Sequence, residues 1–306
     1  MRASCAGMGE SIWQDRRFSK GPTVRQTLRA ELGEKKSEAP CTPIEMSPQV
    51  RRLAETSAIL CGGTAGIGFA TARALARAGV PRLLLVGRSA EKGRLAAALV
   101  QKDHPFIDVR YASADVTSAS GASAAVQRAH DAFGSVDLLV NTAGLTAMPE
   151  LLHKMPISDV APAINGLVHG VLLPSRAVLP IMMEQGGGCI INVASDAGKI
   201  STPGETVIGA GMAAIMMFSR ALANEARRSG VRVNCLTPSI VRGTPLYDEL
   251  MAHPFASKLF AKAEKMASLG VVDAAELADL ATYLASPAAA KLTGQCISMN
   301  GGISTL

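Results

Sequence analysis

The chain has 306 residues, of which 48% are hydrophobic and only 4% aromatic, enough for one large α/β domain or two small ones. Its net charge of +6 is uneven, because residues 1–52 carry a net +4 and the remainder contributes only +2. The globular part is therefore nearly neutral and has no basic stripe, so we expect no nucleic-acid partner. The longest uncharged apolar run, residues 207–218, is too short to span a bilayer, so we expect no membrane partner.

The first 52 residues differ in composition from the rest of the chain. They mix charges with Pro, Ser and Gly and hold no hydrophobic signal core, which argues against a secretory peptide. The acidic residues between Glu31 and Glu45 argue against a mitochondrial presequence. We interpret this extension as disordered, or as an over-extended start with Met46 as the true initiator. An arm that packs on a partner subunit is the alternative.

The six cysteines show neither a CxxC pair nor a Cys/His spacing that suits zinc, so we expect no metal. Cys61, Cys189, Cys235 and Cys296 fall in apolar, strand-like runs. We interpret them as buried free thiols of a reducing compartment. The sequence therefore predicts a cytoplasmic protein.

A glycine-rich turn joins the first strand-like run to the first helical stretch. Residues 57–79 read SAILCGGTAGIGFATARALARAG, in which Ala58–Cys61 predicts a buried strand and Gly79 ends the helical spacing. Glycines in such a turn let backbone N–H groups approach a pyrophosphate, and the start of the helix adds partial positive charge. The stretch therefore predicts the first half of a dinucleotide-binding unit.

Strand and helix patterns alternate from Ser57 to the C-terminus. Alternation of this kind specifies a parallel sheet with helices on both faces. We therefore expect an α/β fold, a single Rossmann-like doubly wound domain over residues 53–306 with a seven-stranded parallel sheet. The expected strands are Ala58–Cys61, Arg82–Val86, Ile107–Ala112, Val136–Asn141, Cys189–Ala194, Val231–Leu236 and Cys296–Met299.

The end of the second expected strand indicates which cofactor is preferred. An NAD-type fold places Asp or Glu about 20 residues past the glycine turn, where the carboxylate holds the ribose hydroxyls. Here that position is Gly87, and Arg88 follows it. A guanidinium in place of a carboxylate suits a 2′-phosphate, so we expect NADP(H) to be preferred over NAD(H). A surface arginine on a loop is the alternative.

Seven motifs in order connect the chain with a known family. They are Gly62-x-x-x-Gly66-Ile67-Gly68, Asp115-Val116, Asn141-Thr142-Ala143-Gly144, Asn165, Ser195 within NVASDAG, Asn234 to Pro238, and the closing LTGQCISMNGG. Together they resemble the short-chain dehydrogenase/reductase family, from about residue 54 to the C-terminus.

The resemblance implies a cofactor site along the carboxyl ends of the strands. Asp115 and Val116 would flank the adenine, and the motif Asn141–Gly144 would line the cofactor after the fourth strand. Thr244 resembles the threonine that touches the carboxamide, although an extra residue shifts it, and Ser239 stands where the family usually has Gly. The expected cofactor-binding residues are Gly62, Thr64, Gly66, Ile67, Gly68, Arg88, Asp115, Val116, Asn141, Ala143, Gly144, Pro238, Ile240 and Thr244.

The family's catalytic residues are only partly present. By the resemblance, Asn165 would sit mid-helix in the active-site water relay, and Ser195 would hydrogen-bond a substrate oxygen. The family's Tyr-x-x-x-Lys pair falls on Ile208 and Met212. Re-alignment does not supply the pair, because the first tyrosine after the serine is Tyr247.

Loss of this pair changes the chemistry that we expect. A positioned general acid contributes about 10²–10⁴ in rate, so interconversion of alcohol and ketone is expected to be poor. Hydride transfer to the far carbon of a conjugated enone places charge on an enolate oxygen, which Ser195 could stabilise. A cationic iminium becomes neutral when it accepts hydride and asks less of an acid. We therefore expect an atypical reductase of an activated C=C or C=N bond.

Several side chains are candidates to replace the proton donor. Glu205 shares a helix face with the replaced pair if the helix starts that early, and burial there would raise its pKa. A loop glutamate that faces water is the alternative. The other candidates, each with a purely structural alternative, are Asp196 beside the serine, His169 one turn after the relay asparagine, Tyr247 and His153.

Two expected helices, Leu151–Glu184 and Gly204–Arg228, resemble the pair that forms the family's four-helix interface. We expect a homodimer or homotetramer, with an active relative as a further candidate partner, and a small apolar or conjugated substrate. Two other functions stay open. One is a catalytically silent subunit or NADP(H) sensor, and the other is a non-redox isomerase or cyclase that uses the same pocket.

Overall fold

A computed structural model describes residues 50–144 and 147–306, which belong to the compact unit Met46–Leu306. Our interpretation concerned an extension of residues 1–52, of which residues 1–49 lie outside the described part. Within the unit, strand and helix alternate along the chain as the sequence predicts.

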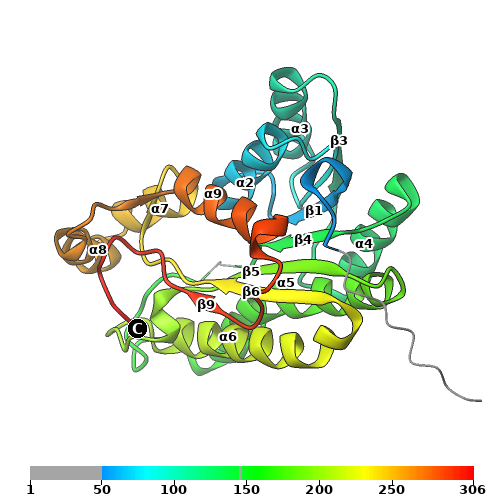
Figure 1. The fold of residues 1–306 in the computed structure, drawn as a ribbon. Helices are drawn as coiled ribbons and strands as arrows, with labels where there is room; N and C mark the ends of the chain where they lie inside the picture. The colour runs from blue at the N-terminus through cyan, green and yellow to red at the C-terminus, as the bar shows by residue number, and fades with distance from the viewer. Residues whose placement is uncertain (1–49, 145–146) are drawn as a thin grey trace, which may run out of the picture. The chain divides into compact units, whose positions relative to one another are not determined.

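Seven parallel strands form the central sheet in Figure 1: β1 (Ser57–Cys61), β2 (Arg82–Gly87), β3 (Asp108–Ser113), β4 (Leu138–Asn141), β5 (Gly188–Val193), β6 (Val231–Leu236) and β9 (Cys296–Ile297). Their order is β3-β2-β1-β4-β5-β6-β9, so the chain winds outward from β1 in both directions. The predicted doubly wound, seven-stranded fold is confirmed.

The large helices cover both faces of the sheet: α2 (Gly66–Arg77), α3 (Ala90–Asp103) and α9 (Ala274–Ala285) on one face, and α4 (Ala119–Phe133), α5 (Ile157–Glu184) and α6 (Thr206–Ala226) on the other. Leu60 packs in the first of these cores and its neighbour Ile59 in the second, because successive side chains leave a strand on opposite faces. Burial on both sides explains why the strands read as continuous apolar runs.

Some boundaries differ from the predicted ones. α5 begins at Ile157 rather than Leu151, because Pro156 precedes it in an extended conformation. β4 begins at Leu138 rather than Val136, and β9 ends at Ile297 rather than Met299. Short 3₁₀ helices lie between the main elements: η1 (Leu53–Glu55), η2 (Asp196–Gly198), η3 (Arg227–Ser229) and η4 (Pro287–Ala289).

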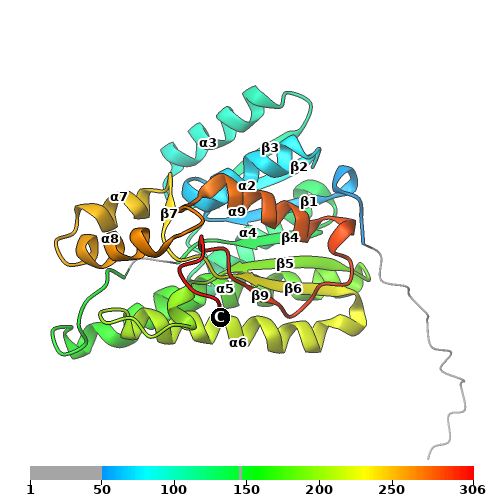
Figure 2. The same cartoon turned by 60° about the vertical axis from the view of Figure 1, so that its left-hand side comes forward.

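A small lobe that the sequence did not predict lies beyond the carboxyl end of the sheet (Figure 2). This α7–α8 lobe contains α7 (Pro245–Ala252), α8 (Ala256–Met266) and a two-stranded parallel sheet of β7 (Val241–Arg242) and β8 (Val272–Asp273). Ile240, Leu250, Ala256 and Phe260 form its own buried core. Its elements are too short to give a clear periodic signal in the sequence.

α5 and α6 have the length and composition of membrane-spanning helices, with mean hydropathies of 1.4 and 1.5. In the fold they pack on each other and on one face of the sheet. Met182 of α5 and Leu222 of α6 lie in that core. Core packing therefore accounts for the apolar side chains on the sheet-facing side of both helices.

Four cysteines in the described part of the chain are free thiols. Cys61, Cys189 and Cys235 are buried as predicted, and burial raises the pKa of Cys61 to about 12. Cys296 was also predicted to be buried, but it is half-buried, because it lies on the edge strand β9.

The two-layer core predicts a sharp contrast between two leucine variants. Leu139 on β4 is fully buried, whereas Leu95 on α3 is 62% exposed. We expect L139A to lower the free energy of unfolding by about 2–5 kcal/mol, because it leaves a cavity. L95A should change it by less than about 0.5 kcal/mol. Urea unfolding followed by circular dichroism measures both, and equal losses would contradict this assignment of the core.

Candidate active site

A cavity of about 750 Å³ opens where the carboxyl ends of the strands meet the α7–α8 lobe. Its walls come from the segments that follow β1, β2, β3, β4, β5 and β6. This edge of a parallel sheet is where open α/β folds bind ligands. All the predicted cofactor residues except Asn141 line the cavity, together with Ser195, Glu205, Ile208 and Met212.

The glycine turn after β1 brings backbone donors to the cavity. Gly62 has a φ of 82°, and a Cβ there would lie 2.6 Å from the Thr142 hydroxyl oxygen, so only glycine fits. The residue before α2 is Ala65, whose side chain cannot cap the helix. The first N–H groups of α2, from Gly66 to Gly68, therefore remain available to an anion at the cavity wall. This cradle suits the pyrophosphate of a dinucleotide.

The part of the cavity beside the end of β2 carries a cation, where many dinucleotide sites carry an acidic residue. Gly87 packs against Thr64, since a Cβ on Gly87 would lie 2.8 Å from the Thr64 hydroxyl oxygen. Arg88 lines the cavity and is exposed. Asp115 nearby accepts hydrogen bonds from the Thr117 N–H (3.0 Å) and hydroxyl (2.6 Å). These bonds, and then the charge of Arg88, hold the pKa of Asp115 below its usual value.

Asn141 does not line the cavity, contrary to our prediction. It is fully buried, and its Nδ2 donates to Ser175 Oγ (3.1 Å) on α5 and to Asn192 Oδ1 (2.9 Å) on β5. The last residue of β4 thus points to the α5 side of the sheet and ties the two strands to the helix. The loop that follows, Thr142 to Gly144, forms the cavity wall instead.

Our prediction that Asn165 belongs to the active site is also wrong. Its side chain is exposed and does not line the cavity, whereas Leu167 on the same helix is 2% exposed and does. Two residues along a helix correspond to about 200° of rotation, so the two side chains point in nearly opposite directions. The residues of α5 that line the cavity, Gly166 and Leu167, therefore bring no polar side chain to it.

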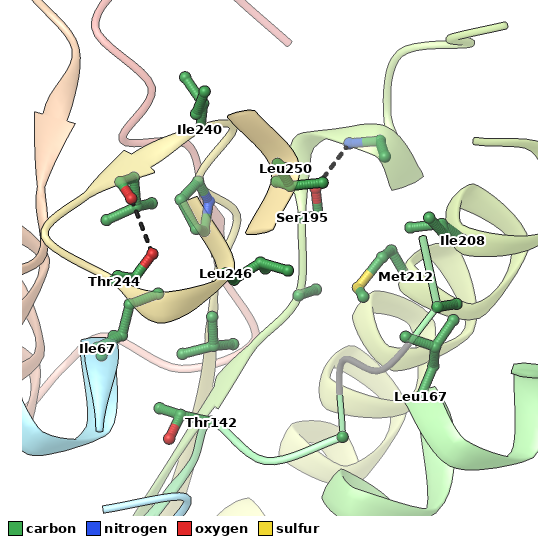
Figure 3. A pocket seen from close by; sticks show the side chains of 18 of the residues that line it. Ile67, Thr142, Leu167, Ser195, Ile208, Met212, Ile240, Thr244, Leu246 and Leu250 are labelled. Carbon is green, nitrogen blue, oxygen red and sulfur yellow. Dashed lines mark hydrogen bonds between the residues drawn. The ribbon is translucent and has the colours of Figure 1, made fainter. Parts of the chain in front are cut away.

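Figure 3 shows Leu167, Ile208 and Met212 together on one side of the cavity. All three are buried and share one core cluster. α5 and α6 meet closely here, since a Cβ on Gly211 would lie 2.9 Å from Leu167 Cδ1. Three apolar side chains from two helices thus form a continuous wall, which we name the apolar wall.

The hydroxyl-bearing side chain of Ser195 lies beside this wall (Figure 3). Its Oγ accepts a hydrogen bond from the Ala197 N–H at 3.2 Å and caps η2. The hydroxyl hydrogen is not used in that bond and can be donated to a substrate oxygen. The position of Ser195 agrees with the role that the sequence predicts for it.

Asp196 and Glu205 are two carboxyl residues that line this part of the cavity, and the exposed Glu249 of the α7–α8 lobe is a third. Glu205 precedes α6, and burial, with a smaller contribution from the negative charge of Asp196, raises its pKa, although a hydrogen bond with Thr202 opposes the shift. Asp196 is only 4% exposed. Its Oδ2 accepts from Asn300 Nδ2 at 3.1 Å, while its Oδ1 has no partner within the described residues.

The other candidate proton donors are less well placed. Tyr247 lines the cavity, but its hydroxyl donates to Glu264 Oε1 at 2.8 Å, and this bond raises the pKa of Tyr247. His153 is exposed and His169 is half-buried, and neither lines the cavity. No group of three His, Cys, Asp or Glu side chains in residues 50–144 and 147–306 is arranged to hold a metal ion.

The α7–α8 lobe and the segment before it supply expected cavity residues and also apolar ones that the sequence did not predict. Thr244 lines the cavity as expected, but its hydroxyl donates to the Val241 carbonyl (3.0 Å) and accepts from the Tyr247 N–H (3.1 Å) as the cap of α7. Ser239, the residue in place of the family glycine, also lines the cavity. The apolar cavity residues of the lobe and the C-terminal segment are Leu246, Leu250, Leu259, Phe260, Met266 and Ile303.

A family model and individual known proteins that match this chain all belong to oxidoreductases. The family model described as "short chain dehydrogenase" matches residues 56–254. The chain is 32% identical over 252 residues to a 3-oxoacyl-[acyl-carrier-protein] reductase of Chlamydia trachomatis, covering 82% of this chain and 98% of that one. It is 34% identical over 256 residues to the oxidoreductase UcpA of Escherichia coli, covering 82% and 95%.

A solved structure shares the fold. A 7α-hydroxysteroid dehydrogenase, complexed with NADH and 7-oxo glycochenodeoxycholic acid, aligns with a TM-score of 0.75 at 27% identity. The alignment covers 82% of this chain and 95% of that chain. The similarity therefore spans nearly all of the described residues.

The raised pKa of Glu205 predicts how stability depends on pH. A carboxyl whose pKa is higher in the folded than in the unfolded state binds protons more tightly when folded, so folding stability falls as pH rises through that range. E205Q cannot ionise and escapes this loss. We expect the Tm of E205Q relative to the parent protein to be higher at pH 7 than at about pH 4. Calorimetry at both pH values measures the difference, and a pH-independent difference would refute the shift.

Proposed function

Because the chain belongs to the short-chain dehydrogenase family, we propose that it is an NADP(H)-dependent reductase of an activated C=C or C=N bond. One observation supports this function above others. A complete dinucleotide cradle adjoins a wall on which Leu167, Ile208 and Met212 offer no proton donor. Bond reduction that does not need a positioned acid fits such a site.

The residues around the cradle would hold the dinucleotide. The N–H groups of Gly66 to Gly68 would bind the pyrophosphate, and Arg88 would pair with a 2′-phosphate. Asp115 stays ionised because of its bonds to Thr117, and it would accept hydrogen bonds near the adenine. When bound, the nicotinamide supplies the hydride.

At the other end of the cavity, the chain binds and orients the substrate. The apolar wall and the lobe present apolar surface to the cavity, and a substrate bound there would displace water and so strengthen electrostatic interactions inside the cavity. Ser195 would donate its free hydroxyl hydrogen to an oxygen on which negative charge develops, as in an enolate. Two alternatives, a silent NADP(H)-binding subunit and a non-redox isomerase, are outcomes of the tests below.

We extend the proposal to assembly and location. Apolar side chains on α5 and α6 remain exposed in the single chain, among them Ile157 at 93% and Met217 at 61%. A homodimer or homotetramer that pairs these helices would bury them. Free thiols at Cys61, Cys189 and Cys235 agree with a cytoplasmic protein.

Arg88 predicts the choice of cofactor. We expect the protein to bind NADPH more tightly than NADH, and R88A to weaken NADPH binding by about 10–100-fold while leaving NADH binding unchanged, since a charged hydrogen bond is lost. Isothermal calorimetry measures each affinity. R94A removes the same charge from the exposed face of α3, away from the cavity, and is the matched control. Failure to bind either nucleotide would overturn the reductase and favour a partner protein.

The apolar wall predicts a gain of function. We expect the parent protein to oxidise NADPH with enones or iminium ions and to reduce ketones poorly. The double variant I208Y/M212K should gain ketone reduction, by about 10²–10⁴ if the new acid is correctly positioned. NADPH absorbance with each substrate class, with circular dichroism as a control for folding, measures this. Fast ketone reduction by the parent protein would contradict the proposal, and turnover without nucleotide would indicate the isomerase.

A further inference from the structure

Two carboxyl side chains line the substrate end of the cavity, near enough that the charge of one contributes to the raised pKa of the other. Asp196 begins η2 directly after Ser195, and Glu205 precedes the first turn of α6; both line the cavity. Asp196 is nine-tenths buried or more, with one oxygen unpartnered among the described residues. We name these two side chains the carboxyl pair.

The carboxyl pair has no salt bridge to any Lys, Arg or His within the described residues. Lys199 lies three residues after Asp196 in the chain, but its Nζ donates to the Cys296 carbonyl at 2.9 Å and to Ser298 Oγ at 2.8 Å. Lys262 of α8 lines the cavity as an exposed side chain. Among residues 50–144 and 147–306, no buried cation therefore neutralises the negative charge of the pair.

Much of the rest of this end is apolar, and the other charged residues of the lobe that line it, Glu249 and Lys262, are exposed side chains. Met212 stands at the position that resembles the family's lysine, so a positive charge is replaced by a thioether. Leu167, Ile208 and the lobe residues Leu246 and Leu250 add further apolar surface. An ionised carboxyl in such surroundings is unfavourable unless it is paired, and an apolar cation is the ligand that pairs with it.

We propose that the substrate is an apolar cation with a C=N bond, an iminium ion, whose positive charge is held by the Asp196–Glu205 carboxyl pair. This inference rests on the proposed reductase function and selects C=N over C=C within it. It also explains why the apolar wall carries neither a proton donor nor a lysine, since a lysine there would repel the substrate.

The reaction balances without an acid. The iminium carbon accepts a hydride, with its electron pair, from the reduced nicotinamide dinucleotide, which is thereby oxidised. The π electrons of the C=N bond move to nitrogen and become its lone pair, so the cation becomes a neutral amine. No proton is needed for this transfer, so the absence of a proton donor at Ile208 and Met212 does not hinder it.

The test compares a cation with its uncharged analogue. N-methyldihydroisoquinolinium is an apolar cyclic iminium, and dihydronaphthalene has the same ring shape without the charge. Calorimetry with the full chain should show that the cation binds at least about tenfold more tightly than the analogue. E205Q, which keeps the shape of the side chain, should weaken cation binding by about tenfold or more and leave the analogue unchanged.

Two further variants keep the test decisive. E225Q removes a carboxylate from an exposed position on the same helix, outside the cavity, and should not change cation binding. D196N retains an oxygen that can accept from Asn300 and should weaken binding as E205Q does, with circular dichroism to confirm folding. Equal binding of cation and analogue, or full cation affinity in E205Q, overturns the inference.

NADPH oxidation separates this inference from the proposed function. Oxidation with the iminium, faster than with cyclohexenone, supports both. Oxidation with cyclohexenone alone leaves the reductase standing and overturns the cationic substrate. Oxidation with neither, while NADPH still binds, overturns the reductase and the reduction of C=N together, and the calorimetric comparison then reports only on the carboxyl pair as a cation site.

Discussion

The structure depends on the close approach of α2 to the end of β1. Gly62 leaves the strand with a positive φ, and a Cβ there would collide with Thr142 in the loop after β4. Because Gly62 has no side chain, the first turn of α2 lies directly against the ends of β1 and β4. That contact places unsatisfied N–H donors at the mouth of the sheet, and the remainder of the cavity is built outward from them.

The cavity has two ends with opposite character. At one end, backbone donors and Arg88 offer positive potential to phosphates, and the Asp115 carboxylate is fixed by Thr117. At the other end, the apolar wall on α5 and α6 faces the α7–α8 lobe. A dinucleotide laid along the strand ends would bring its reactive ring to the apolar end, where few polar groups remain to take part in chemistry.

Those remaining polar groups determine which chemistry suits the site. Ser195 can donate a hydrogen bond, but Ile208 and Met212 supply neither a proton nor a positive charge. Asp196 and Glu205 instead bring negative charge into a poorly solvated space, which raises the pKa of Glu205. A substrate that is already positively charged suits this site for two reasons. It needs no proton donor when it accepts a hydride, and it neutralises the carboxylates.

The sequence by itself determined the sheet, the glycine turn and the positions of Ser195, Ile208 and Met212, because apolar runs and glycine spacing are local features. Only the tertiary structure decided which faces meet the cavity. Asn165 and Leu167 differ by half a turn, and packing against α6 selects the leucine. Burial of Asn141 likewise depends on contacts with α5. The convergence of Asp196, Glu205 and the lobe on one cavity arises from long-range packing that no local pattern encodes.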